Sequence, residues 1–525
     1  MAWLKKNVFT TVVILLLVAA VAVLALEAGV VLTPPQAEQG QVSQGSFENR
    51  DAPATEPVKA WPNTTGLNDY ELGLVLDPVN KQMSGTLNFT YTNAETVPMS
   101  ELHFLLYANS HEKESYNIFE ASDIERAYPN GFSPGSIKIE SVTAVGSPLD
   151  WVVGGEQNEV LKVHLPGAVK PGGTSALEIK YTVNIPNCYG RFGYGKDTMS
   201  LVNCNPILSV YDEGKWFDYP YYNEGDPFYS ETANFHATIT APKEYTIAAT
   251  GVLTERENGN SRVWTVEAPA RRDFGFITSD RFDVAEKTVD GVLVRSYYIR
   301  GNENRGRAAL DTGAESIALY DSLYGQYPYS EFSVAQADFF IGGMEYPGLV
   351  LIDGSYYKAF SDKKVLDLIV AHETGHQWWY STIGDDEVMT PWLDEGLTEF
   401  TTQVFFEKRR DKTYNDFYDL QIDYMASERL ENEASVTDPS YKFTSGLTYS
   451  AWVYDRTAAI LQELRGKLGD EKFFTAMKQY YNDNRLGITT REDLEKAFED
   501  VSGEELTQWF EERFSDPGDS PLDAE

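Results

Sequence analysis

The stretch that decides the fold reads HETGH over residues 372–376, and PWLDEG follows it over residues 391–396. On a helix, positions i and i+4 point the same way about one turn apart, so the imidazoles of His372 and His376 can reach one ion. Glu373 stands beside the first imidazole, where it can reach a water at that ion. This spacing predicts a catalytic zinc site on a helix.

A catalytic zinc ion needs a third protein ligand and an open position for water. Glu395 is the candidate, because it lies early on the next predicted helix, 19 positions after His376, and an antiparallel return would bring it back beside the pair. Glu399 lies one turn further on the same face, either as a hydrogen-bond acceptor for a ligand histidine or as a solvated carboxylate. The sequence therefore predicts one zinc ion held by His372, His376 and Glu395.

The pattern of apolar residues divides the chain into two kinds of structure. Between residues 68 and 283, short runs such as 84–91 and 234–241 alternate polar with apolar residues and are separated by turns. Such runs predict a β-sandwich or barrel. After about residue 287, apolar residues recur every three or four positions, which predicts helices over 307–323, 363–380, 391–410, 454–468 and 470–481 and two short ones within 491–514. The predicted fold class is α+β and multidomain, with an all-β sandwich over 61–284 and a mainly helical domain over 285–515.

The N-terminus has the pattern of a targeting segment. Lys5 and Lys6 precede an uncharged apolar run over residues 8–26, which is long enough for a membrane-spanning helix. The basic flank should stay in the cytoplasm, so the body of the protein is expected outside it. A cleaved signal peptide is the alternative, since residues 20–22 read AVA, a small-residue cleavage pattern. We therefore assign residues 1–32 to an anchor or signal, 33–60 to a flexible linker and 516–525 to an acidic tail.

The charge and the cysteines restrict the partners. The net charge of −37 over 525 residues repels nucleic acid, so no nucleic-acid partner is expected. The plain interpretation of this acidity is a solvated surface that keeps the protein soluble. The two cysteines, Cys188 and Cys204, lie close enough in sequence to form a disulfide outside the cytoplasm, or they are two buried free thiols.

The zinc motif resembles that of the aminopeptidase N family of gluzincin zinc metallopeptidases. A second stretch, GGMEYPG over residues 342–348, is similar to the family's G-x-M-E-N motif, and its Gly343 lies 29 positions before His372. The resemblance implies that Gly342, Gly343 and Met344 bind substrate backbone and that Glu345 holds the free α-ammonium of a peptide. A carboxylate suits this role, because an α-amine with a pKa near 8 is largely cationic at neutral pH. Read alone, the segment is a Gly-rich edge strand.

A third stretch, SAWVYDR over residues 450–456, resembles the family's Tyr-x-Lys-Gly stretch. The resemblance implies that Tyr454 donates a hydrogen bond to the tetrahedral intermediate of peptide hydrolysis. The family resemblance covers about residues 68–515. It implies a thermolysin-like catalytic domain in a short, bacterial-type member that lacks the C-terminal helical domain. Four positions depart from the family pattern: Tyr346 and Asp394 stand where Asn is usual, and Arg456-Thr457 replaces Lys-Gly.

The predicted function is that of a zinc-dependent aminopeptidase, which hydrolyses N-terminal peptide bonds of peptides outside the cytoplasm with Glu373 as general base. A zinc endopeptidase with the same metal site would dispense with the role of Glu345. A membrane-tethered, non-catalytic binding protein is the third interpretation, and the intact Glu373 and Tyr454 argue against it. The expected location is the cell membrane, with one span and the catalytic domain outside, or the exterior if the N-terminal segment is cleaved.

Overall fold

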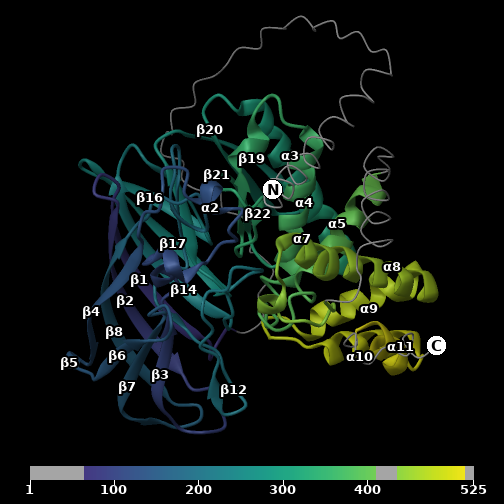
Figure 1. Cartoon of the computed structure of the whole chain (residues 1–525), viewed down its shortest axis with the longest axis horizontal. Helices are drawn as coiled ribbons and strands as arrows, with labels where there is room; N and C mark the ends of the chain where they lie inside the picture. The colour runs from purple at the N-terminus through teal and green to yellow at the C-terminus, as the bar shows by residue number, and fades with distance from the viewer. Residues whose placement is uncertain (1–63, 410–433, 515–525) are drawn as a thin grey trace, which may run out of the picture. The chain divides into compact units, whose positions relative to one another are not determined.

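The computed structural model describes residues 64–409 and 434–514 (Figure 1). The predicted anchor, the linker over 33–60 and the tail over 516–525 lie outside these residues and stay predictions. Within the described ranges, no helix is both long and apolar enough to cross a membrane.

An eight-stranded sheet forms the largest part of the N-terminal region. Its strands are antiparallel except for the parallel pair β1 and β14. Its order is β16-β17-β14-β1-β2-β8-β4-β5, with bounds β1 (Asn68–Asp77), β2 (Gln82–Thr92), β4 (Ser136–Ala144), β5 (Ser147–Pro148), β8 (Thr174–Asn184), β14 (Ala233–Pro242), β16 (Val252–Asn258) and β17 (Ser261–Arg271).

Two four-stranded sheets and a two-stranded ribbon complete this region. The first sheet has the order β11-β3-β7-β6, with β3 (Met99–Leu105), β6 (Trp151–Gly154), β7 (Val160–Val169) and β11 (Ile207–Leu208). The second has the order β15-β18-β10-β9, with β9 (Phe192–Tyr194), β10 (Met199–Val202), β15 (Thr246–Ala249) and β18 (Gly275–Ser279), and the ribbon pairs β12 (Tyr211–Asp212) with β13 (Lys215–Trp216). Short helical turns connect some strands: η1 (Tyr107–His111), η2 (Glu114–Tyr116) and α2 (Ile124–Ala127).

The core of this region follows from the alternation in sequence. On β1, every second side chain is buried, including Leu72 and Leu74, while the residues between them are half-buried or exposed. These side chains share one apolar cluster with Phe104 of β3 and Phe276 of β18. Because one face of each alternating strand is apolar, the sheets pack through that face. The predicted β-rich N-terminal region is confirmed.

A five-stranded mixed sheet begins the second region. Its order is β19-β20-β21-β23-β22, with β19 (Phe282–Val289), β20 (Val292–Ile299), β21 (Glu331–Ala337), β22 (Gly343–Met344) and β23 (Leu349–Asp353). The sequence prediction of helices after about residue 287 missed most of it, because strands such as β23 are buried on both faces and do not alternate. The predicted boundary at 284/285 falls inside β19, and this division of the chain stays a prediction.

Helices make up most of the remaining chain, which runs from green to yellow in Figure 1. Together with one face of the five-stranded sheet they enclose a single apolar core. The predicted α+β fold class is therefore confirmed. The helices are α3 (Glu303–Tyr324), η3 (Gly354–Tyr357), α4 (Lys363–Trp379), α5 (Glu395–Arg409), η4 (Ser440–Lys442), α7 (Gly446–Tyr449), the π-helix η5 (Ser450–Arg456), α8 (Thr457–Leu468), α9 (Asp470–Asp483), α10 (Arg491–Ser502) and α11 (Thr507–Arg513).

Helix α5 begins later than the sequence predicts. The predicted helix starts at residue 391, where the Thr390 side chain could cap it, whereas α5 starts at Glu395. Residues 391–394 form a turn in which the N–H of Glu395 donates to the carbonyl of Pro391 at 3.0 Å. The Thr390 hydroxyl donates instead to the Asp386 carbonyl at 3.1 Å. Asp394 and Glu395 consequently stand at the N-terminal end of α5, where the helix dipole favours carboxylates.

Both cysteines are free thiols. Cys188 and Cys204 are buried in two different apolar clusters. Burial raises the pKa of each thiol to about 12. Of the two alternatives that the sequence left open, the structure shows the pair of buried thiols.

Candidate metal centre

Helices α4 and α5 bring three buried donor atoms together. The Nε2 atoms of His372 and His376 are 3.1 Å apart, and Glu395 Oε2 lies 3.1 Å from the first and 3.2 Å from the second. Ligands at about 2.0–2.1 Å from a tetrahedral zinc ion lie roughly 3.3–3.4 Å from one another. The triangle thus has nearly the size of one face of a zinc coordination tetrahedron, and two imidazoles with one carboxylate are a donor set that suits zinc.

The opposite ring nitrogens of both histidines face oxygen atoms. His372 Nδ1 lies 3.3 Å from Glu399 Oε2, and His376 Nδ1 bonds to Asp394 and to the Thr398 hydroxyl, the latter at 3.1 Å. A carboxylate at Nδ1 fixes the ring so that Nε2 points at the shared centre. The structure thus places Glu399 beside a ligand histidine and not in solvent. The contact of Asp394 was not predicted, although its position next to Glu395 was a signal for it.

The two imidazoles and the carboxylate of this donor set shift one another's pKa values. Burial lowers the pKa of His372, but hydrogen bonds with Glu395 and Glu399 outweigh this effect and raise it to about 9. Burial alone would raise the pKa of Glu395, but His376 and His372 hold it well below its usual range. Glu395 is therefore ionised, which is the form that binds a metal.

Glu373 lies against the strand that carries the second motif. Burial raises the pKa of its carboxyl group to about 7. A Cβ atom on Gly343 would lie 2.2 Å from Glu373 Oε1, so any other residue here would displace the Glu373 carboxyl group. The preceding Gly342 has φ +116°, a conformation that other residues rarely adopt. The two glycines thus allow the strand to approach Glu373 closely.

Glu345 follows β22 and lies at the same centre. Its side chain is 3% exposed, and donor atoms of Glu345, Glu373 and His376 all lie within 4.8 Å of one another. Glu345 Oε1 has no hydrogen-bond partner among the described residues. Burial raises the pKa of Glu345 well above its usual range, and the charge of Asp226 raises it further. The structure therefore joins the second motif to the metal donors.

Tyr454 completes the set and projects from the π-helix η5. Its hydroxyl donates to Glu395 Oε1, and its ring stacks on that of His372 with centroids 5.7 Å apart. Thr457, which departs from the family pattern, lies directly against Gly396. A Cβ on Gly396 would lie 2.2 Å from Thr457 Cγ2, so the glycine after Glu395 makes room for the threonine.

A buried ion pair from the β-rich region also reaches the site. Arg191 donates to Asp226, to the Tyr221 hydroxyl at 3.2 Å and to Met344 Sδ at 3.1 Å. Asp226 contributes to the raised pKa values of both Glu345 and Glu373. These two loop residues lie far from the motifs in sequence and follow no periodic pattern, so sequence reasoning missed them.

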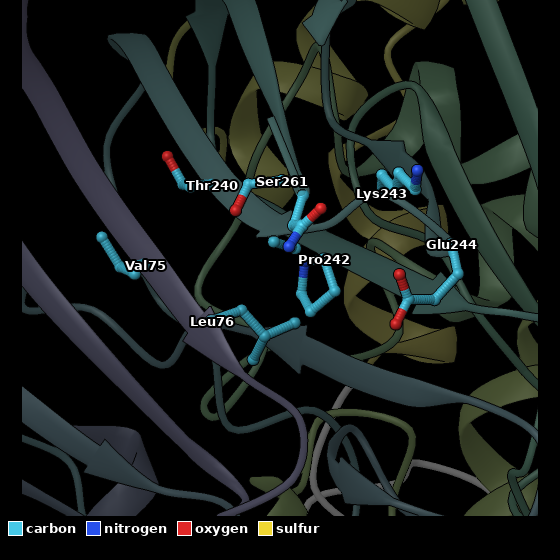
Figure 2. A pocket seen from close by; sticks show the side chains of 9 residues that line it. Val75, Leu76, Thr240, Pro242, Lys243, Glu244 and Ser261 are labelled. Carbon is cyan, nitrogen blue, oxygen red and sulfur yellow. The ribbon is translucent and has the colours of Figure 1, made fainter. Parts of the chain in front are cut away.

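A separate hollow lies in the β-rich region (Figure 2). It has a volume of about 510 Å³ and is lined by Val75 and Leu76 of β1, residues 240–244 and residues 260–261. Its charged side chains are Lys243 and Glu244, and none of the metal-site residues lines it.

The fold and the donor set define a zinc-metallopeptidase type of site, and comparisons with known proteins agree. The peptidase family M1 domain matches residues 308–513. The chain is 26% identical over 294 residues to aminopeptidase M1 of Arabidopsis thaliana and 25% identical over 275 residues to aminopeptidase N of Escherichia coli, which is 53% and 49% of the chain. It spans about a third of the length of these relatives, 33% and 32%.

A solved structure supports the same fold. The M1 zinc metallopeptidase of Deinococcus radiodurans is similar with a TM-score of 0.61 and 17% identity, over 85% of this chain and 93% of that one. These similarities support the aminopeptidase N family that the motifs predict.

Proposed function

We propose that this protein is a zinc-dependent aminopeptidase that hydrolyses the first peptide bond of peptides with a free N-terminus. The observation that carries the proposal is Glu345, a buried carboxylate beside the metal donors that lacks a partner for Oε1 among the described residues. Burial raises the pKa of Glu345, and a cation beside it would favour the ionised form. The α-ammonium of a peptide is such a cation at neutral pH.

The catalytic roles follow from the positions of the side chains. His372, His376 and Glu395 would hold zinc, which when bound polarises a carbonyl and lowers the pKa of water. Glu373 takes a proton from the attacking water and passes it to the leaving amine, and its pKa of about 7 suits a base at neutral pH. Tyr454 turns its hydroxyl from Glu395 to the carbonyl oxygen as negative charge develops there.

Glu345 sets where the chain is cut. By holding the α-ammonium, it leaves the first peptide bond at the metal donors, and this fixed placement removes much of the entropic barrier. Gly342, Gly343 and Met344 supply the backbone along which the substrate lies.

The proposed location rests on the N-terminal sequence. The basic residues Lys5 and Lys6 before the apolar run over residues 8–26 support an exported protein. The catalytic region would then act outside the cytoplasm, held on the membrane by one span or released by cleavage.

Hydrolysis of aminoacyl arylamides tests the proposal. We expect the purified protein to cleave members of a panel of such substrates, to lose activity with a metal chelator and to recover it with about one zinc equivalent per chain. His376→Ala should bind less than a tenth of that zinc. Activity that survives complete removal of metal, or a zinc-loaded protein that cleaves no member of the panel, would contradict the proposal.

A further inference from the structure

The side chain of Gln377 joins the metal helix to the strand that carries Glu345. Gln377 follows His376 on α4 and is fully buried. Its Oε1 accepts the N–H of Gly348 at 2.7 Å. Its Nε2 donates to the carbonyls of Glu345 at 3.1 Å and Tyr346 at 3.3 Å.

These bonds hold the segment that follows β22, which the sheet contacts at Gly348, whose carbonyl accepts the N–H of Ser333 of β21 at 2.9 Å. Strand β22 pairs with β23 only at Gly343 and Met344, and the chain then leaves the ladder. The Tyr346 carbonyl also accepts the N–H of Leu349 at 2.9 Å, which closes a turn. Buried backbone groups need partners, and Gln377 supplies them at the residue that bears the proposed amine-binding carboxylate.

We propose that Gln377 is a positioning residue that fixes the distance between the metal and Glu345 and thereby restricts cleavage to the first peptide bond. It is bonded covalently to one metal ligand and, through its amide, to the backbone of Glu345. A single side chain thus links the backbone of His376 to the backbone of Glu345. Arg191 holds the neighbouring Met344 from the opposite region of the chain, so the segment is fixed from two directions. This inference rests on the proposed aminopeptidase function.

A purely structural role for Gln377 would give a different result from a positioning role. Loss of buried hydrogen bonds lowers stability wherever it occurs in the chain. If Gln377 instead sets the distance between the metal and Glu345, its loss weakens the binding of an inhibitor's α-amine and leaves binding of the inhibitor to the metal intact. Two hydroxamates that differ only in the α-amine, leucine hydroxamate and 4-methylpentanohydroxamate, separate these effects because both carry the same metal-binding group.

The experiment compares inhibition constants in zinc-loaded wild-type protein, Gln377→Met and the matched control Gln403→Met. Gln403 is a buried glutamine on α5 that lies close to Gln462 rather than to the strand. We expect Gln377→Met to reduce the ratio of the two inhibition constants about tenfold, with the constant of the amine-free compound and the zinc content unchanged. Gln403→Met should keep the wild-type ratio.

A second variant covers the case in which Gln377→Met fails to fold, as judged by circular dichroism. Gln377→Glu keeps an acceptor for the N–H of Gly348 but faces the carbonyls of Glu345 and Tyr346 with a carboxylate, so the same fall in the ratio is expected. A wild-type ratio in a folded Gln377 variant would overturn the inference. A wild-type protein whose two constants are equal would instead refute the proposed aminopeptidase function.

Discussion

At the scale of single residues, three carboxylates at one centre differ in protonation because their surroundings differ. The neighbouring imidazoles of His372 and His376 hold the pKa of Glu395 low, whereas burial raises the pKa of Glu373 to about 7 and that of Glu345 well above its usual range. Environments that separate the pKa values of adjacent acids assign them different roles. This separation fits the proposed roles of a metal ligand, a proton carrier and an acid that ionises when a cation pairs with it.

The first prediction concerns the proton carrier. Glu373→Gln keeps the size of the side chain but cannot accept a proton, so kcat should fall by about 10²–10⁴-fold. Metal analysis should still find about one zinc per chain, since the three donors are unchanged. A variant with normal kcat would remove Glu373 from its role as general base.

Much of the site at this scale could be predicted from the sequence. His372 and His376 follow from helix geometry, and Glu395 from its place on the next helix together with the family resemblance. The contacts of Gln377 and Arg191 could not be predicted in this way. They depend on how separate segments pack, and neither spacing nor composition records that packing.

At the scale of elements, the π-helix η5 places two tyrosines on one face. Its wider turn brings Tyr449, immediately before it, and Tyr454 together, with ring centroids 5.8 Å apart. Such helices are rare and often occur at functional sites. The sequence predicted a helix from residue 454 onward but gave no sign of the π-helix, because the apolar spacing of a short π-helix hardly differs from that of an α-helix.

The second prediction belongs to this element. Tyr454→Phe removes the hydroxyl proposed to stabilise the developing oxyanion, so kcat should fall by about 10²–10³-fold while KM changes little. Steady-state kinetics on an arylamide substrate measure both values. Tyr441→Phe, at an exposed tyrosine that packs on Tyr222, is the control and should match the wild type. A kcat within about twofold of wild type in Tyr454→Phe would contradict its assignment.

At the scale of the whole molecule, the β-rich and helical regions share structure. One apolar cluster combines Tyr107 and Phe228 of the β-rich region with Leu349 and Leu351 from the five-stranded sheet. The buried Arg272 donates to carbonyls on both sides, among them Ser230 at 2.6 Å and others at Tyr380 and Gly487. Sequence patterns predicted both regions but not this shared core, because periodicity reports which face is apolar and not what packs against it.

A pair of glutamates lies where the β-rich region contacts the helical region. Glu224 bonds to Glu120, and Glu120 also accepts the N–H of Gly446 at the start of α7. Burial raises the pKa of Glu224 from 4.5 to about 9, and the charges of Glu120 and Asp123 add to this. Because the folded state holds this proton more tightly than the unfolded chain, the group's contribution to stability is lost as pH rises towards about 9.

The third prediction follows from this loss of stability with rising pH. Between pH 6 and pH 9, the Tm of the wild type should fall further than the Tm of Glu224→Gln, which cannot ionise. Thermal unfolding across this pH range measures the difference. Glu492→Gln, at an exposed glutamate on α10, should follow the wild type. Parallel profiles for the wild type and Glu224→Gln would show that Glu224 ionises freely in the folded protein.

The need for a free N-terminus at a zinc site is tested most directly by following a peptide of about ten residues by mass spectrometry, with its N-terminus free or acetylated. The free peptide should lose one residue at a time from its N-terminus, the acetylated peptide should stay intact, and a chelator should protect both. Internal fragments, or equal loss from the acetylated peptide, would contradict the roles assigned to Glu345 and to the metal centre beside it.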